Sequence, residues 1–190
     1  MYGSINFISL TDAYFLRNKR SMAWLCFREG EGKTTNALWM ALRAAGYGYR
    51  VIIIRFMKGR KYIREYKVKD RLAPEYEIHQ FGRDEFIDFR NPEPLDYELE
   101  AEGVEFAKKA LRRKPRILVL DKINLAVHFG ILKTEDILKL LENVPGETTV
   151  ILTGRRTPEK LVERADLVTE LSFIKHPFKK NVPAREGLEY

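Results

Sequence analysis

Hydrophobic residues fall into short continuous or near-continuous runs, separated by longer stretches with helical spacing. The runs lie at 22–27, 51–56, 77–81, 116–121, 148–152 and 166–173. Runs of this length are typical of strands buried on both faces of a parallel sheet. Two longer stretches, 34–45 and 96–114, carry apolar residues on one helical face. Strands alternating with helices predict an α/β fold like that of P-loop NTPases, with a mainly parallel sheet and helices on both faces.

We expect a single domain over residues 22–173. An N-terminal arm over 1–21 would pack on a partner subunit, close over the site or be poorly ordered, and a C-terminal tail over 174–190 would pack on the domain. Thr134 and Thr157 are expected to cap helices, the second with a proline in its first turn.

The segment between the first strand and the first helix carries the candidate chemistry. It reads Arg28-Glu29-Gly30-Glu31-Gly32-Lys33-Thr34-Thr35. Strand, glycine-bearing loop, Lys-Thr and helix are the context of a P-loop, in which backbone N–H groups and the helix N-terminus bind phosphate oxygens. Lys33 would reach the terminal phosphates and the Thr34 hydroxyl would hold Mg²⁺. Because the general P-loop pattern has glycine where this chain has Phe27, an ordinary strand-to-helix turn is the alternative.

A second candidate site residue ends the apolar run at 116–121. The run finishes in Asp121, and the carboxyl ends of parallel strands are where α/β sheets bind ligands. There the carboxylate would hold Mg²⁺ directly or through water. The alternative is an aspartate that only caps the following helix.

Composition narrows the class of partner and the cellular compartment. The chain has 190 residues and a net charge of +7, which favours an anionic partner such as a polyphosphate or a nucleic acid. The only cysteine is Cys26, so no intrachain disulfide can form, as is typical of the reducing cytoplasm. No apolar run reaches the ~20 residues of a membrane span, and the N-terminus lacks the features of a secretory signal.

The segment 58–71 is basic and carries tyrosines. It is either a solvated helix face or a surface for an anionic ligand or nucleic acid.

Several stretches together resemble the P-loop-type ATP:cob(I)alamin (corrinoid) adenosyltransferases. The loop resembles that family's shortened G-N-G-K-G-K-T-T. Further likeness lies at 42–48, 56–59, 118–121 with 123–124 and 128, 152–155, 165–170, 175–178 and 183–190. The resemblance runs from about Met22 to the C-terminus, and the order and spacing of its parts are specific to this family.

The resemblance implies transfer of the 5′-deoxyadenosyl group of ATP to the cobalt of a reduced corrinoid, with triphosphate leaving. Cobalt(I) is the nucleophile, so the protein has to hold the ribose carbon in line with cobalt and to stabilise the charge on triphosphate. Lys33, Mg²⁺ and Arg155 would meet the second need. The resemblance further implies a homodimer, a flavoprotein electron donor and a cytoplasmic enzyme.

Other positions take expected roles from the same resemblance. Arg43, in the matching helix end, would join the loop in binding ATP. Phe86 and Phe89 are the nearest aromatic candidates for displacing the lower axial ligand of the corrinoid, and His128 would line the corrinoid face.

The chain departs from the family at the sites that matter most. Arg28 stands where the family has its first loop glycine, and a positive φ there would cost ~1 kcal/mol or more. Glu29 replaces an asparagine. Lys122 replaces a glutamate that binds magnesium, and an ammonium has no lone pair to offer a metal. Either Asp121 and Thr34 suffice, or the Lys122 ammonium replaces part of the metal's charge, or the site is impaired.

Two other functions compete with adenosyl transfer. The departures suggest a relative that binds nucleotide or corrinoid without efficient turnover. The basic segment 58–71 suggests a nucleic-acid-stimulated ATPase, the weakest of the three because it gives no reason for the motifs of the C-terminal half.

Overall fold

A computed structural model describes residues 21–59, 64–175, 183, 185 and 187. The expected N-terminal arm and most of the expected C-terminal tail lie outside these residues.

Six parallel strands form one sheet, and their order is β3-β2-β4-β5-β1-β6. The strands are β1 (Met22–Phe27), β2 (Val51–Arg55), β3 (Tyr76–Gln80), β4 (Ile117–Asp121), β5 (Thr149–Thr153) and β6 (Leu167–Glu170). The predicted α/β class with a mainly parallel sheet is therefore confirmed. Each central strand begins and ends within one residue of its predicted run, because a doubly buried strand needs an unbroken apolar sequence.

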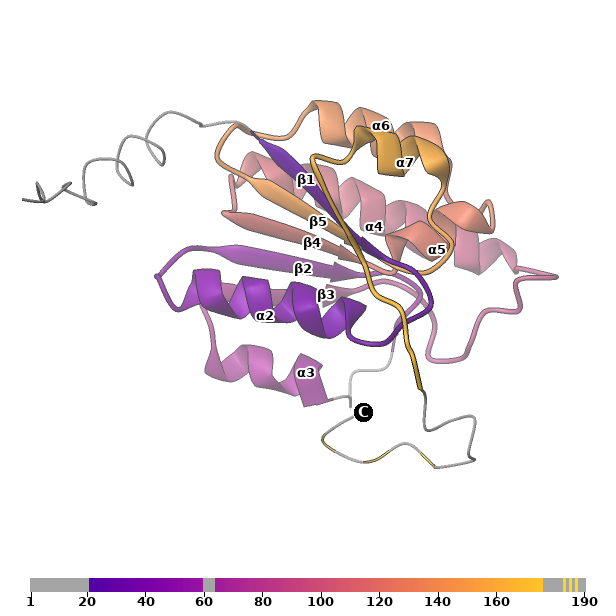
Figure 1. Cartoon of the computed structure of the whole chain (residues 1–190), viewed down its shortest axis with the longest axis horizontal. Helices are drawn as coiled ribbons and strands as arrows, with labels where there is room; N and C mark the ends of the chain where they lie inside the picture. Colours follow the sequence, from indigo (N-terminus) through magenta and orange to yellow (C-terminus); the bar gives the residue numbers. More distant parts are fainter. Residues whose placement is uncertain (1–20, 60–63, 176–182, 184, 186, 188–190) are drawn as a thin grey trace, which may run out of the picture.

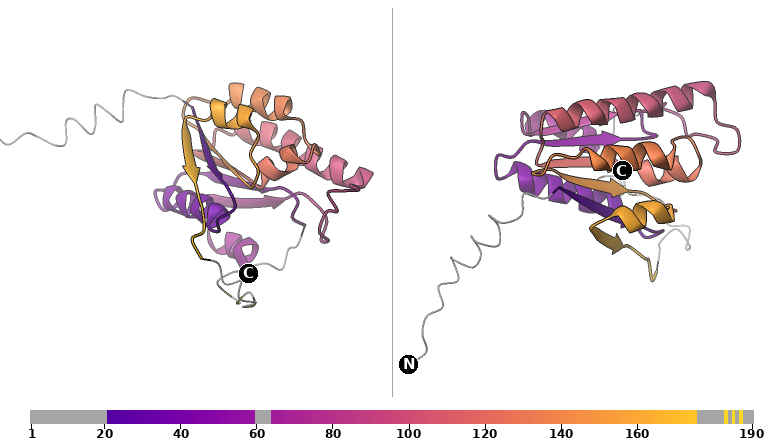
Figure 2. Two further views of the ribbon diagram at one scale, coloured as in Figure 1. Left: turned by 45° about the vertical axis from the view of Figure 1, so that its right-hand side comes forward. Right: turned by 90° about the horizontal axis from the view of Figure 1, so that it is seen from above.

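Helices cover both faces of this sheet (Figures 1 and 2). One face carries α2 (Lys33–Ala45), with the short α3 (Arg64–Lys67) and a 3₁₀ turn (Val68–Arg71) beyond it. The other face carries α4 (Pro94–Arg112), α5 (Ile123–His128), α6 (Thr134–Glu142) and α7 (Glu159–Arg164).

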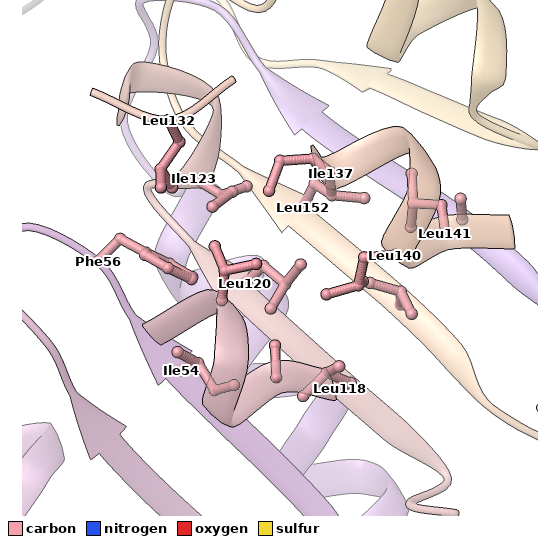
Figure 3. Packing of buried hydrophobic residues seen from close by; sticks show 14 of the residues in the cluster. Ile54, Phe56, Leu118, Leu120, Ile123, Leu132, Ile137, Leu140, Leu141 and Leu152 are labelled. Atoms are coloured by element: carbon pink, nitrogen blue, oxygen red, sulfur yellow. The ribbon is translucent and has the colours of Figure 1, made fainter. Parts of the chain in front are cut away.

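The core is divided between these two faces because side chains alternate along each strand. In β2, Val51 and Ile53 pack with Ala37 and Ala41 of α2. Ile54 belongs to the larger cluster on the opposite face, where helices α4 to α7 meet the sheet. Figure 3 shows the aliphatic side chains of β4 and β5 among those of α6. Each such fully buried side chain stabilises the fold by about 1.5–3 kcal/mol.

Two predicted helix caps are wrong by one residue. Lys133 is the N-cap of α6, and Thr134 is already helical. Pro158 is the N-cap of α7, so the proline precedes the first turn. Thr157 has another use, because its hydroxyl accepts a 2.9 Å hydrogen bond from the Asn124 amide. Instead, acidic residues in the first turns of both helices stabilise the helix ends by interacting with the positive end of the helix dipole.

The last strand also ends earlier than predicted. β6 stops at Glu170, and Leu171 then donates its N–H to the carbonyl of Phe27 and accepts the N–H of Gly30. The backbone beyond β6 therefore supports the loop that follows β1.

Among the helices that the structure describes, none combines the length and apolarity needed to span a bilayer.

Candidate active site

The loop after β1 is a tight turn that leads directly into the N-terminus of α2. Gly32 is the N-cap of α2 with φ 91°, and α2 begins at Lys33. Gly30 lies against the chain beyond β6, where an added Cβ would stand 2.3 Å from the Leu171 carbonyl oxygen. Its N–H donates a 2.7 Å hydrogen bond to the same oxygen. Only glycine fits at position 30.

Arg28 has φ 85°, so the residue that replaces the family's glycine does take the left-handed conformation. This conformation costs a non-glycine residue about 1–2 kcal/mol. The Arg28 side chain forms an ion pair with Glu170 at the end of β6. The loop therefore adopts a left-handed turn at Arg28. It is anchored to β6 by this ion pair and by the backbone hydrogen bonds of Leu171, the residue after β6.

The two loop glutamates lie at the edge of the site. Glu29 is half-exposed, and its Oε2 lies 3.5 Å from Nε of Arg155. Glu31 is exposed and lines the cavity described below. Because Glu29 holds an arginine predicted to bind triphosphate, an arriving phosphate would compete with Glu29 for Arg155.

A cavity of about 370 Å³ opens at the N-terminus of α2. Its lining brings together the loop, the start of α5 and the residues after β5: Glu31, Gly32, Lys33, Thr34, Thr35, Lys122, Leu125, Thr153, Gly154 and Arg155. The walls thus carry three cationic side chains beside a helix N-terminus, an arrangement that suits a polyphosphate.

Lys33 is half-buried in this cavity, and its ammonium donates to the carbonyl of Gly30. Burial, together with the neighbouring charge of Arg155, lowers the pKa of Lys33, although Glu29 and Glu31 act in the opposite direction. The lysine is positioned to exchange the Gly30 carbonyl for a phosphate oxygen.

Asp121 ends β4 and is completely buried. Its Oδ1 accepts hydrogen bonds from the hydroxyls of Thr34 (2.7 Å) and Thr153 (2.6 Å). The predicted pair Thr34 and Asp121 is therefore in direct contact. The alternative role for Asp121, capping the next helix, is not seen, because Lys122 is the N-cap of α5 and no side chain caps it.

Two cations missed by the sequence analysis face the other carboxylate oxygen of Asp121. Nζ of Lys58 and Nε of Arg55 each lie 3.4 Å from Oδ2. Burial alone would raise the pKa of Asp121, but Lys58, Arg55 and the two hydroxyls lower it to about 2. Asp121 is therefore ionised throughout the ordinary pH range.

Arg55 is fully buried at the end of β2 and also binds Glu65 of α3 at 2.9 Å. The sequence does carry a signal that Arg55 has a special role, because this arginine ends an otherwise apolar strand. Its partner is visible only in the strand register, which pairs Arg55 of β2 with Asp121 of β4.

Lys122 follows Asp121 with φ 70°, and its N–H donates to the Thr153 hydroxyl at 3.1 Å. Burial lowers the pKa of Lys122 to about 8, with contributions from the like charges of Lys58 and Arg55, while Asp121 opposes the shift. At neutral pH the cavity wall therefore carries an ammonium that has a charged carboxylate and other cations close by.

The side chains around Asp121 do not fit a magnesium site. Mg²⁺ is held by oxygen ligands, with one or two carboxylates beside the substrate phosphates. Here one oxygen of Asp121 accepts from two hydroxyls, and the other faces Lys58 and Arg55. Across the described residues, no group of three or more His, Cys, Asp or Glu side chains could hold a metal ion. A divalent cation would also add charge beside Lys122.

An aromatic group lies at the C-terminal end of α5. The ring of Phe89 stacks on Phe129 with centroids 4.0 Å apart, and His128 meets Phe129 edge-on at 5.0 Å. The structure thus joins two of the predicted corrinoid-facing residues through Phe129, which the sequence analysis missed. Arg156 lies over the same ring at 5.7 Å. The sequence signal that could have identified Phe129 as part of this group was its position directly after His128.

Two predicted residues, Phe86 and Arg43, are not among those that line the cavity. Phe86 is 82% exposed in the loop before α4. Arg43 is exposed in the last turn of α2, ten residues along the helix from Lys33 and thus roughly 15 Å away at 1.5 Å per residue. Their roles stay predictions.

The chain matches the model of the family described as ATP:corrinoid adenosyltransferase BtuR/CobO/CobP over residues 20–190. It is 29% identical over 174 residues to the corrinoid adenosyltransferase of Pseudomonas aeruginosa, covering 92% of this chain and 86% of the relative. It is 33% identical over 163 residues to the corrinoid adenosyltransferase of Escherichia coli, covering 85% of this chain and 81% of the relative. With a P-loop, a cationic cavity and a family match over nearly its whole length, this chain belongs to the ATP:corrinoid adenosyltransferase family.

Proposed function

We propose that this protein transfers the 5′-deoxyadenosyl group of ATP to the cobalt of a reduced corrinoid and releases triphosphate. The observation that carries the proposal is the cavity at the start of α2, where Lys33, Lys122 and Arg155 gather around the phosphate-binding loop. Family membership supplies the substrates, ATP and a corrinoid, that these groups would serve.

The reaction is a displacement at C5′ of the ribose. Cobalt(I) supplies the electron pair of the new Co–C bond, and the C5′–O bond breaks with its electrons passing to triphosphate. No proton has to be removed from the nucleophile, so the protein needs no general base. Its task is to align the two substrates and to stabilise the growing charge on the leaving oxygen.

The cationic side chains would perform the second task. Lys33 and Arg155 both line the cavity, one at the start of α2 and the other after β5. The N–H groups at the start of α2 add donors with fixed directions. Because such groups are already oriented before the reaction, they stabilise the developing charge without a reorganisation cost.

The aromatic group on α5 is our candidate for the corrinoid side. Leu125 lines the phosphate cavity, and His128 lies three residues later on the same helix, so the two share one helix face. Phe89 and Phe129 beside His128 offer flat apolar surface to a corrin ring. Phe86 is a further candidate in the same loop as Phe89.

Three features of the setting belong to the proposal and rest on the family resemblance. The enzyme would act as a homodimer, receive electrons for cobalt from a flavoprotein, and work in the cytoplasm, where ATP is available. Arg43 keeps its predicted role in ATP binding within this proposal.

An anaerobic assay tests the proposal. The protein is mixed with ATP and chemically reduced cobalamin, and the absorbance spectrum is recorded before and after illumination. We expect a light-sensitive alkyl-cobalt product that does not form with the Lys33→Ala variant. Failure to form this product, under conditions in which the E. coli relative forms it, would contradict the proposal.

A further inference from the structure

The carboxylate expected to hold a metal already has four protein groups beside it. Oδ1 of Asp121 accepts from Thr34 and Thr153, and Oδ2 lies 3.4 Å from both Lys58 and Arg55. These four groups come from α2, β5, β2 and the segment after β2, so the arrangement is fixed by four parts of the fold. A magnesium ion bound directly to Asp121 would compete with these hydrogen bonds and would lie beside two cations.

The charges around Asp121 are also already balanced. Arg55 and Lys58 bring two positive charges, which Asp121 and Glu65 match with two negative ones. Lys122 stands outside this balance, and no carboxylate is within ion-pair distance of its ammonium among the residues described. Lys122 lines the cavity together with Lys33 and Arg155.

The backbone of Lys122 is held as firmly as the carboxylate beside it. Its left-handed conformation starts α5, and its N–H is bound to the Thr153 hydroxyl, which in turn donates to Asp121. Asp121, Thr153 and Lys122 therefore form one connected unit at the cavity wall. An ammonium there can donate up to three hydrogen bonds to phosphate oxygens.

We propose that Lys122 takes the place of the divalent cation at the polyphosphate, so that this protein binds ATP without magnesium. Arg55 and Lys58 act as positioning residues, because they occupy Asp121 and keep it from recruiting a metal. This inference rests on the proposed function, since it assumes that the cavity binds ATP.

Calorimetric titration of the full chain with ATP tests this inference. We expect dissociation constants that agree within about threefold in EDTA and in excess magnesium. The Lys122→Glu variant restores the family's residue. It should bind ATP at least about tenfold more weakly than the parent in EDTA and should regain affinity when magnesium is added.

Lys139→Glu is the matched control, because it makes the same change of charge at an exposed position in the last turn of α6. It should bind ATP like the parent protein in both buffers. If Lys122→Glu fails to fold by circular dichroism, Lys122→Asn replaces it, since asparagine tolerates the left-handed conformation. That variant should lose affinity in EDTA without regaining it in magnesium.

The outcomes separate the inference from the proposed function. ATP binding by the parent that requires magnesium would overturn the inference and leave the proposed function intact. Equal binding by the parent and the position-122 variant in EDTA would overturn it as well. The absence of ATP binding in both buffers would overturn the proposed function itself.

Discussion

The two sides of the cavity at the start of α2 differ in what a substitution alters, the backbone turn or the side-chain chemistry. On the β1–α2 side, Arg28 replaces a glycine, yet the backbone keeps the left-handed turn and β6 anchors it. On the β4–α5 side, Lys122 stands where the resemblance implies a glutamate, and it lies near Lys58 and Arg55, which face Asp121. A backbone-driven site can absorb an unsuited side chain at a cost of about 1–2 kcal/mol. At a site built from side chains, a change of one side chain alters the charge that a ligand meets.

The largest expected effect belongs to Lys33 on the backbone-driven wall. Removing its ammonium with Lys33→Ala takes away a charge that faces the leaving triphosphate. We expect kcat/KM for adenosyl transfer to fall by about 100-fold or more, the usual range for one preorganised donor. A steady-state assay with reduced cobalamin measures the effect. A loss below tenfold would mean that Arg155 and Lys122 carry most of the charge stabilisation.

The next effect belongs to Asp121 on the other wall. Asp121→Asn places an NH₂ donor where Oδ2 now faces Lys58 and Arg55, so Glu65 alone remains as a counter-charge for these two cations. We expect unfolding free energy to fall by about 3 kcal/mol in urea titrations. Asp136→Asn, an exposed change in the first turn of α6, is the control and should cost less than about 1 kcal/mol. Equal losses in the two variants would show that the cluster around Asp121 is not a stabilising unit.

A smaller effect, with a defined pH dependence, belongs to Glu100 of α4. Burial raises its pKa to about 8, partly opposed by the Met57 N–H, which donates to it at 2.8 Å. The folded carboxyl thus holds its proton where the unfolded chain releases it. Stability should therefore be highest below the unfolded pKa of about 4.3 and should decline as pH rises toward 8.

Glu100→Gln should remove this decline while keeping an acceptor for the Met57 N–H. We expect the variant to gain stability over the parent by up to about 1.4 kcal/mol for each pH unit between about pH 4 and pH 8, and the difference to vanish below about pH 4. Urea titrations at several pH values measure both. A variant that is less stable than the parent at pH 8 would show that Glu100 is ionised in the folded protein.

The smallest effect should come from Arg28→Gly. Glycine relieves the left-handed strain but loses the ion pair with Glu170 and raises the entropy of the unfolded chain. These effects nearly cancel, so stability should change by less than about 1 kcal/mol and ATP affinity by less than about threefold. A large change in either, measured by urea titration and calorimetry, would show that Arg28 itself shapes the site.

Local patterns were enough to predict most of the fold. The apolar runs located the strands, and the loop from Arg28 to Thr35 located the cavity at the start of α2, because strand, turn and helix N-terminus are adjacent in sequence. The missed residues depend on distant contacts. Arg55 acquires its role only when β2 and β4 pair in register, and Phe129 only when the loop carrying Phe89 folds back onto α5. The Thr157 hydroxyl was likewise predicted as a cap but binds Asn124 across 33 residues.

The central claim is adenosyl transfer, and the fate of the nucleotide tests it most directly. ³¹P NMR of an anaerobic reaction with ATP and reduced cobalamin identifies the phosphorus-containing product. The account predicts inorganic triphosphate, formed one for one with light-sensitive adenosylated corrinoid. ADP and orthophosphate without the adenosylated product would contradict it, because they would show attack at a phosphorus atom rather than at C5′.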